Sequence, residues 1–208
     1  MEVHTQSGQQ YALGSHAEEL ARLEHQAAVI ERPTRMLLQA AGLAPGMRVL
    51  DLGTGLGHVA RIAGELVGPR GSVLGIDQSA DALAVARERT QAAGATHVTF
   101  MQGMADTWRD SGPFDAVIER LLLFHVPDPA AVVRHHIENL RPGGAFVAID
   151  FDIGNARADP ALPVVDDALQ WVREAFLAAG AWPRIGARLG TILENAGLRR
   201  VTTFGIQA

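Results

Sequence analysis

The chain has 208 residues, of which 48% are hydrophobic and 20% charged, a composition that is ordinary for one soluble globular domain. It contains no cysteine and all 18 basic residues are arginine, which excludes disulfides, thiolate nucleophiles, cysteine-ligated metals, lysine Schiff bases and the lysine-dependent P-loop. The formal net charge is −5 and the arginines are scattered, so we expect no nucleic-acid partner.

Targeting and membrane-spanning segments are not visible in the sequence. No apolar run approaches the roughly 20 residues that a membrane helix requires. The polar N-terminus lacks the basic and then apolar pattern of a signal peptide. We therefore expect a cytoplasmic protein without a membrane partner.

The predicted elements begin with two helices and continue as an alternation of strands and helices. The first helix is expected near residues 17–31 and the second near 33–42, where Pro33 suits a first helical turn. Short β-rich runs then alternate with stretches of helical periodicity. The expected strands are 48–52, 72–77, 97–102, 114–120, 145–150 and 199–206, and the expected helices are 57–68, 79–94, 129–140, 164–180 and 185–197.

This order of elements predicts the fold class. Apolar strands without polar alternation indicate burial on both faces, as in a parallel sheet. Their alternation with helices predicts a doubly wound α/β fold with a mostly parallel sheet and right-handed crossovers. Ligands of such folds bind beyond the carboxyl ends of the strands, so the loop at 51–58 is the expected binding site.

The stretch "VLDLGTGLGHVA", residues 49–60, carries Gly53, Gly55 and Gly57 at every second position. These glycines permit unusual backbone angles and remove Cβ atoms from a ligand's path. Their spacing differs from the dinucleotide fingerprint G-x-G-x-x-G, whose third glycine would fall on His58. The spacing therefore disfavours NAD, although a tight strand–helix turn without a ligand is the simpler alternative.

Two acids narrow the choice of ligand. Asp51 heads the loop, where it would repel a pyrophosphate but attract an ammonium or sulfonium group. Asp77 ends the second strand, about 20 residues past the end of the glycine loop, where an acid binds ribose hydroxyls. The two acids and the glycine loop together favour a cationic nucleoside such as S-adenosylmethionine (SAM).

Five stretches in order resemble a known family: "VLDLGTGLGHVA", "GIDQS", "VTFMQGMADTW", "FDAVIERLLLFHVPDP" and "LRPGGAFVAID". With them the chain resembles the class I SAM-dependent methyltransferases, of the small-molecule branch that includes the quinone-biosynthesis methyltransferases. The resemblance implies a Rossmann-like methyltransferase fold, SAM as cofactor and S-adenosyl-L-homocysteine as its product. We expect one domain over 1–208, with an N-terminal helical lid at 1–42, a SAM-binding core at 43–151, and substrate-side helices and the last strand at 152–208.

The loop argument and the resemblance together predict the cofactor-binding residues. They lie before the first helix, in the glycine loop, at the ends of the second and fourth strands and after the third. The set is Tyr11, Asp51, Gly53, Thr54, Gly55, Gly57, Asp77, Gln78, Gly103, Met104, Ala105, Glu119, Arg120 and Leu121.

Three of these residues have open roles. Asp51 either orients the methionyl amino group of the cofactor or caps the N–H groups of its own loop. Glu119 either places an acid near the sulfonium or is a solvated acid paired with Arg120. Tyr11 either folds over the cofactor with the following helix or tethers that helix by packing.

The sequence departs from the family's pattern at two places. The family often has an acid where this chain has Met104, so Asp106 or backbone groups and apolar packing would hold the adenine instead. The family's sheet usually has seven strands, whereas this sequence predicts six with the seventh missing. We expect the sixth strand to pair beside the fifth, or an open edge there to be covered by another chain, giving a homodimer.

The catalytic candidate is His125, which follows the fourth strand and titrates near neutral pH. Its alternative role is structural, as a bridge between backbone groups. We expect the acceptor pocket to be formed by residues 1–35 and 151–185. Trp171, Phe176 and Trp182 occur in the second of these segments, where their helical spacing favours core packing over a pocket lining.

No metal site is expected, because the histidine pairs do not share a helix face. His135 and His136 are adjacent and point to different sides of a helix, so both are expected at the surface or the core edge. The favoured function is methyl transfer from SAM to a small-molecule acceptor. The alternatives are a SAM-binding but inactive homologue, a protein or nucleic-acid methyltransferase, and, disfavoured by the glycine spacing, a NAD-dependent reductase.

Overall fold

The computed structural model describes residues 17–109 and 112–206. In these ranges five strands form one sheet in the order β3-β2-β1-β4-β5, and every neighbouring pair is parallel. The chain moves outward from β1 to β3, then returns to the other side of β1 as β4 and β5. This doubly wound parallel sheet confirms the predicted fold class. The strands are β1 (Arg48–Leu52), β2 (Ser72–Asp77), β3 (Val98–Gln102), β4 (Phe114–Arg120) and β5 (Leu140–Ile149).

Seven helices and three short 3₁₀ turns connect and cover these strands in the described ranges. Their ends agree with the expected ends to within a few residues, and the Ser79 hydroxyl caps α4 by accepting from the Ala82 N–H at 3.2 Å. None of the described helices is long and apolar enough to cross a membrane. The elements are α1 (Ala17–Val29), α2 (Glu31–Ala40), α3 (His58–Val67), α4 (Ala80–Ala92), η1 (Leu123–His125), α5 (Pro129–Ile137), η2 (Ile153–Asn155), α6 (Pro163–Ala178), η3 (Gly186–Arg188) and α7 (Leu189–Asn195).

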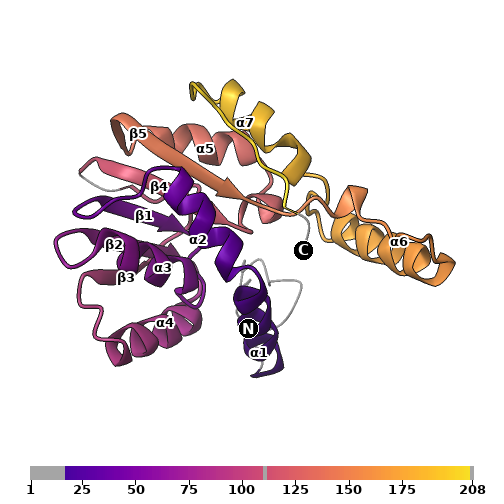
Figure 1. Cartoon of the computed structure of the whole chain (residues 1–208), viewed down its shortest axis with the longest axis horizontal. Helices are drawn as coiled ribbons and strands as arrows, with labels where there is room; N and C mark the ends of the chain where they lie inside the picture. The colour runs from indigo at the N-terminus through magenta and orange to yellow at the C-terminus, as the bar shows by residue number, and fades with distance from the viewer. Residues whose placement is uncertain (1–16, 110–111, 207–208) are drawn as a thin grey trace, which may run out of the picture.

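The sheet has a hydrophobic core on each face, as expected for buried parallel strands. On one face α2, α3 and α4 pack against residues such as Val49, Val73 and Ile118. On the other face α5 and α7 pack against the β4–β5 half of the sheet, and Leu50 and Val117 point to this side. Figure 1 shows these two helical layers on either side of the strands. The carboxyl ends of all five strands therefore meet at one edge, which the layers leave accessible.

The expected sixth strand is not formed, and this part of the prediction was wrong. Residues 201–206 have no strand pairing in the described chain. Arg200 has a φ of +57°, a left-handed conformation that interrupts an extended run. Val201 then packs with the cluster around α7, while Phe204 is 64% exposed. As a result β3 and β5 are the two edge strands of the described sheet.

Helix α6 extends away from the sheet, at the right of Figure 1, and none of its residues is buried. The expectation that its aromatic residues belong to the core was therefore wrong for Trp171, which is 70% exposed. Phe176 is half-buried and packs edge-on against Phe124, with ring centroids 5.4 Å apart. Trp182, after the helix, is partly exposed and donates its indole N–H to the Val126 carbonyl at 3.1 Å.

Candidate functional site

The glycine loop joins β1 to α3 at the carboxyl edge of the sheet. All three of its glycines have positive φ, and Gly57, at +74°, stands directly before the first residue of α3. A Cβ on Gly57 would lie 2.9 Å from the Phe100 ring, so packing alone requires this glycine. A Cβ on Gly55 would meet no atom within 4 Å. The loop therefore presents an open backbone surface at Gly55, where a ligand can approach closely.

Asp77 connects this loop to the start of α4. Its Oδ2 accepts from the Gly55 N–H at 2.8 Å, and its Oδ1 accepts from the Ser79 N–H at 2.9 Å. The side chain is almost fully buried, yet each carboxylate oxygen keeps a further lone pair. Asp77 thus fixes the loop geometry and retains the capacity to accept from hydroxyl groups.

Asp51 lies below the loop, and it is 1% exposed. Its Oδ2 accepts from the Thr54 hydroxyl at 2.5 Å. Burial raises the pKa of Asp51 to about 7, even though the Thr54 hydroxyl and the charge of Arg120 favour the ionised form. Arg120, at the end of β4, is itself anchored by donating to the Thr34 hydroxyl of α2 at 3.1 Å. Asp51 thus holds its own loop through the Thr54 hydroxyl, a role close to the alternative in which it caps the loop N–H groups.

The segment after β3 lies beside Asp77. The Gly103 N–H donates to the Asp77 carbonyl at 2.9 Å, and the Gln102 side chain donates to the Gln78 carbonyl at 2.9 Å. Met104 is 51% exposed. His136, which was expected at the surface or core edge, is fully buried below this segment and donates to the Ala105 carbonyl at 2.5 Å. Burial lowers the pKa of His136 to about 4, so it is neutral in this role.

Two acids, the fully buried Glu119 and the half-buried Asp150, hold the turn after β4. Glu119 is fully buried, and its Oε2 accepts from the Leu122 and Leu123 N–H groups at 3.3 and 3.4 Å. Asp150, directly after β5, accepts from the Phe124 N–H at 3.0 Å. Burial and then the charge of Asp150 raise the pKa of Glu119 well above its usual range. Burial also raises the pKa of Asp150 to about 7, so the pair retains a proton near neutral pH.

The turn that these acids hold has a strained start. Leu121 has a φ of +59°, which is rare for a branched side chain, and such strain concentrates at functional sites.

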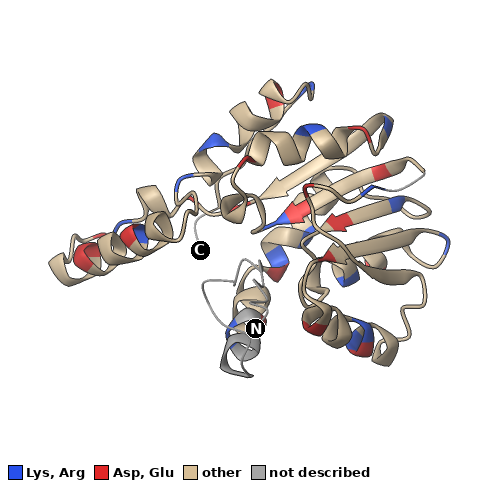
Figure 2. Ribbon diagram, turned by 180° about the vertical axis from the view of Figure 1, so that it is seen from behind, with Lys and Arg blue, Asp and Glu red and all other residues tan. Residues whose placement is uncertain are grey.

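Glu119 does not have the structural role that the sequence offered as an alternative. It is fully buried rather than solvated, and no contact in the described residues pairs it with Arg120. Its Oε1 has no hydrogen-bond partner there. Figure 2 shows acidic residues at strand arrowheads along this edge of the sheet.

His125 closes the turn and is half-buried, with its ring 3.7 Å from that of Phe124 between centroids. Burial, followed by the charge of Arg22 in α1, lowers the pKa of His125 and keeps it neutral at pH 7. The influence of Arg22 means that α1 lies near this end of the site. Tyr11, the remaining predicted residue, lies outside the described residues.

Sequence reasoning missed Asp150. The signal was available, since an acid at the end of a predicted parallel strand is the same pattern that identified Asp77. What the pattern does not contain is the adjacency of Glu119 and Asp150, which follows from the pairing of Arg120 with Ile149 between β4 and β5.

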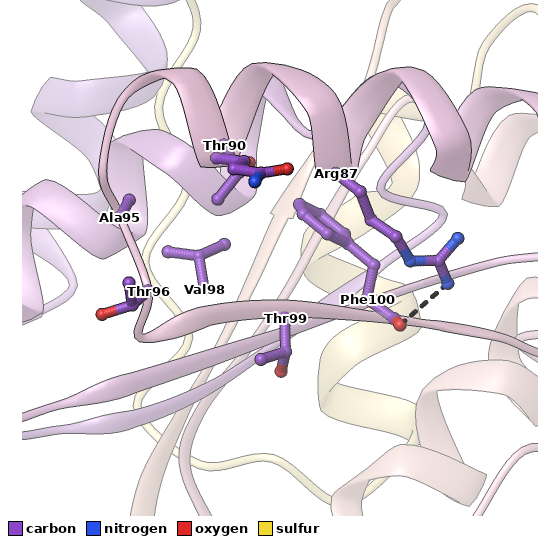
Figure 3. Close-up of a pocket in the computed structure, with 8 residues that line it drawn as sticks. Arg87, Thr90, Ala95, Thr96, Val98, Thr99 and Phe100 are labelled. Atoms are coloured by element: carbon purple, nitrogen blue, oxygen red, sulfur yellow. Dashed lines mark hydrogen bonds between the residues drawn. The ribbon is translucent and has the colours of Figure 1, made fainter.

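A cavity of about 460 Å³ lies away from this edge, between α4 and the outer side of β3 (Figure 3). Arg87 spans it and donates to the Phe100 carbonyl at 3.0 Å, which caps part of the free strand edge. The cavity shares no lining residue with the predicted site, so the site is defined by the glycine loop rather than by this hollow.

The fold and the site define an α/β domain with a candidate ligand site beyond the carboxyl ends of its strands. A family model described as a methyltransferase domain matches residues 43–197. The chain therefore belongs to this family of methyltransferase domains, and the class I methyltransferases that it resembles use SAM as their cofactor. The glycine loop, open at Gly55 and bordered by Asp77, fits that cofactor.

Comparisons with individual proteins agree with this assignment. The chain is 34% identical over 130 residues to the arsenite methyltransferase of Aquipseudomonas alcaligenes, covering 59% of this chain and 38% of that protein. It is 30% identical over 134 residues to the demethylmenaquinone methyltransferase of Lactococcus lactis, covering 64% and 51%. It thus spans about half the length of these relatives or less. A putative methyltransferase structure from Bacillus halodurans is 27% identical, with a TM-score of 0.62, over 79% of this chain and 68% of that one.

Proposed function

We propose that this chain transfers the methyl group of SAM to a small-molecule acceptor. The observation that carries the proposal is the open backbone surface at Gly55 beside Asp77, in a chain whose family is that of methyltransferase domains. Residues 43–151 would hold the cofactor. Residues 1–35 and 151–185 would form the acceptor pocket, with α1 near His125 and α6 at the other flank.

The cofactor's ribose would be held by Asp77 through the lone pairs that Gly55 and Ser79 leave free. Its methionyl tail would cross the loop at Gly55, with the tail carboxylate at the N–H groups that begin α3. Asp51 and Thr54 would set the shape of the loop from below. The backbone of Glu119, Arg120 and Leu121 would border the sulfonium end.

When bound, SAM supplies a methyl group on a positively charged sulfur, and an acceptor lone pair displaces that sulfur, which takes up the electrons of the broken bond. The residues of this chain mainly hold and orient the two reactants. His125, neutral at pH 7, would take the proton that an oxygen or nitrogen acceptor loses. The Glu119–Asp150 pair would position His125 by fixing the turn that carries it.

The acceptor class is inferred from the relatives and from charge. The matched relatives are named for arsenite and for demethylmenaquinone, both small molecules. Figure 2 shows the arginines dispersed over the described chain rather than gathered on one face, which disfavours a nucleic-acid acceptor. A cytoplasmic location accords with the sequence and is also proposed.

The test is turnover of SAM labelled in its methyl group, with phenols, amines, quinone precursors and arsenite as acceptors. We expect labelled product with at least one acceptor. His125→Gln should lower kcat about 100-fold without changing the dissociation constant of S-adenosyl-L-homocysteine. Binding of SAM without turnover of any acceptor would favour the inactive homologue, and equal kcat in the variant would remove His125 from the reaction.

We also propose that a second copy covers the free edge of β5. The Ile149 carbonyl accepts from the Leu121 N–H at 2.8 Å, so the polar groups of Ile149 face β4 and those of Ala148 face outward. The unpaired N–H and C=O groups of such an edge strand can form hydrogen bonds with a strand of another chain. Sedimentation velocity should give a dimer for the native chain and a monomer for Ala148→Pro. A native monomer at micromolar concentration would contradict the proposal.

A further inference from the structure

The end of β3 indicates how this chain recognises the base of its cofactor, an inference that rests on the proposed function. Asp77 is paired with Gln102 across β2 and β3, and the Gly103 N–H donates to the Asp77 carbonyl at 2.9 Å. With the ribose at Asp77 and the methionyl tail on the β1 side, the base can extend only toward β3. It would then lie over Gly103, Met104 and Ala105.

Two backbone carbonyls of this segment already accept hydrogen bonds within the chain. The Met104 carbonyl accepts from the Thr107 N–H at 3.2 Å and from the Trp108 N–H at 2.8 Å, which fills both of its lone pairs. The Ala105 carbonyl accepts from His136 at 2.5 Å. The segment is also rigid at its start, because a Cβ on Gly103 would lie 2.5 Å from the Trp108 indole. These carbonyls cannot turn toward a ligand without breaking internal bonds.

The side chain available to the base is a neutral thioether. Met104 is 51% exposed, and a methionine sulfur contacts aromatic rings favourably but accepts hydrogen bonds only weakly. The nearest following acid, Asp106, is exposed, and no hydrogen bond to a described residue orients its carboxylate toward the base. The Ala105 N–H donates to no acceptor in the described ranges, so it remains available to a ring nitrogen.

We propose that Met104 packs on the purine ring of the cofactor and that the 6-amino group of this ring makes no hydrogen bond with the protein. The ring is held by packing on Met104 and by the Ala105 N–H, and the amino group points to solvent. An analogue that lacks the amino group but keeps the ring nitrogens should therefore bind about as tightly as the natural nucleoside. An analogue with two methyl groups on that nitrogen should be tolerated for the same reason.

The test compares S-adenosyl-L-homocysteine with its 6-deamino analogue, in which hydrogen replaces the amino group, by calorimetric titration of the full chain. We expect dissociation constants within about threefold for the native chain. Met104→Asp adds a charged acceptor, and it should favour S-adenosyl-L-homocysteine by about tenfold, less than a fully buried bond would give. The dimethylated analogue should also bind the native chain about as tightly as S-adenosyl-L-homocysteine does. It should bind Met104→Asp less tightly, because its nitrogen has no hydrogen to donate to the new carboxylate.

Two matched variants separate the explanations. Met36→Asp introduces the same change on α2, where Met36 is 57% exposed, and should leave the ratio of the two constants unchanged. Asp106→Asn should also leave it unchanged. If the native chain prefers S-adenosyl-L-homocysteine over the 6-deamino analogue by tenfold or more, the proposal is overturned. If that preference is then absent in Asp106→Asn, Asp106 is the residue that accepts from the 6-amino group.

A native ratio near one that Met104→Asp does not change would contradict the assignment of Met104. Absence of S-adenosyl-L-homocysteine binding is a separate result, because it overturns the proposed function itself. Circular dichroism of each variant establishes that it is folded before its constants are compared.

Discussion

Acidic side chains at the strand ends govern this site at the scale of single residues. Four acids lie at the carboxyl ends of β1, β2, β4 and β5, either in the last two residues of the strand or directly after it, and each is almost entirely buried or half-buried: Asp51, Asp77, Glu119 and Asp150. Their hydrogen bonds differ: Asp77 braces two backbone N–H groups, Asp51 braces a hydroxyl, and the other two hold the turn after β4. Residue type and spacing predicted Asp51 and Asp77, but the closeness of Glu119 to Asp150 depends on strand register, which spacing does not specify.

Asp51 should make the stability of the ligand-free protein fall as pH rises. Its pKa is about 7 in the folded chain and about 3.9 when unfolded, so the folded state binds more protons between these values. The stabilisation by the protonated form is complete below about pH 4 and is lost as pH rises through 7. The loss amounts to at most about 4 kcal/mol, and Asp150 adds to it in the same direction. Because burial lowers the pKa of His58 and His136 to about 4, these histidines add slopes of the opposite sign, so the contribution of Asp51 is measured as a difference between the native chain and a variant in urea unfolding from pH 5 to 8.

The variant Asp51→Asn keeps an acceptor for the Thr54 hydroxyl but cannot titrate. The stability of the native chain relative to this variant should decrease as pH rises from 5 to 8, and this difference separates Asp51 from the other buried groups that titrate, Asp150 and the histidines. Parallel slopes for the two proteins would show that Asp51 is ionised throughout, and would contradict the role of burial in setting its pKa.

At the scale of elements, the sequence predicted most helices and strands but not the fate of the sixth strand or the exposure of α6. Helix and strand positions could be predicted from periodicity and capping, as at Ser79, because those signals are local. The sixth strand could not, since its formation requires a partner edge and an extended backbone, and Arg200 is left-handed. The core assignment of Trp171 failed for a related reason: helical spacing reports an apolar stripe but not whether anything packs on it.

Gly55 and Gly57 should separate binding from stability. Each has a positive φ, so alanine costs about 1 kcal/mol at either position. Gly57→Ala adds a clash with Phe100 and should lower the free energy of unfolding further, by roughly 1–3 kcal/mol. Gly55→Ala places its methyl in the open ligand surface and should weaken S-adenosyl-L-homocysteine binding more than Gly57→Ala does, relative to its stability loss. Urea unfolding and calorimetry on the same samples test this, and equal losses in both measurements would argue against a ligand at Gly55.

Helix α6 should tolerate truncation of its exposed tryptophan. Trp171→Ala should change the free energy of unfolding by less than about 0.5 kcal/mol, because the side chain is 70% exposed. Phe176→Ala is the matched control, and it should cost about 2 kcal/mol through the lost packing on Phe124. If the two variants are destabilised equally, Trp171 is covered in solution, and a stability loss that depends on protein concentration would point to a second copy.

For the whole molecule, the sheet order explains why one edge gathers the predicted residues. The chain reverses direction across the sheet between β1 and β4, and the loops after these strands diverge there. The sequence predicted this arrangement because alternating strands and helices allow few topologies. The sequence left two outcomes for the edge of the fifth strand, namely a sixth strand paired beside it or an open edge. The choice between them depends on whether residues 199–206 pair with β5, which local patterns do not determine.

The most direct test of the central claim is calorimetric titration of the chain with S-adenosyl-L-homocysteine and, separately, with NAD. We expect a saturable signal at one site per chain for S-adenosyl-L-homocysteine and none for NAD. Asp77→Asn, which replaces one acceptor oxygen by a donor facing backbone N–H groups, should weaken binding at least about tenfold. No heat with S-adenosyl-L-homocysteine at about 1 mM, or saturable binding of NAD, would contradict the assignment of the glycine loop to a cationic nucleoside.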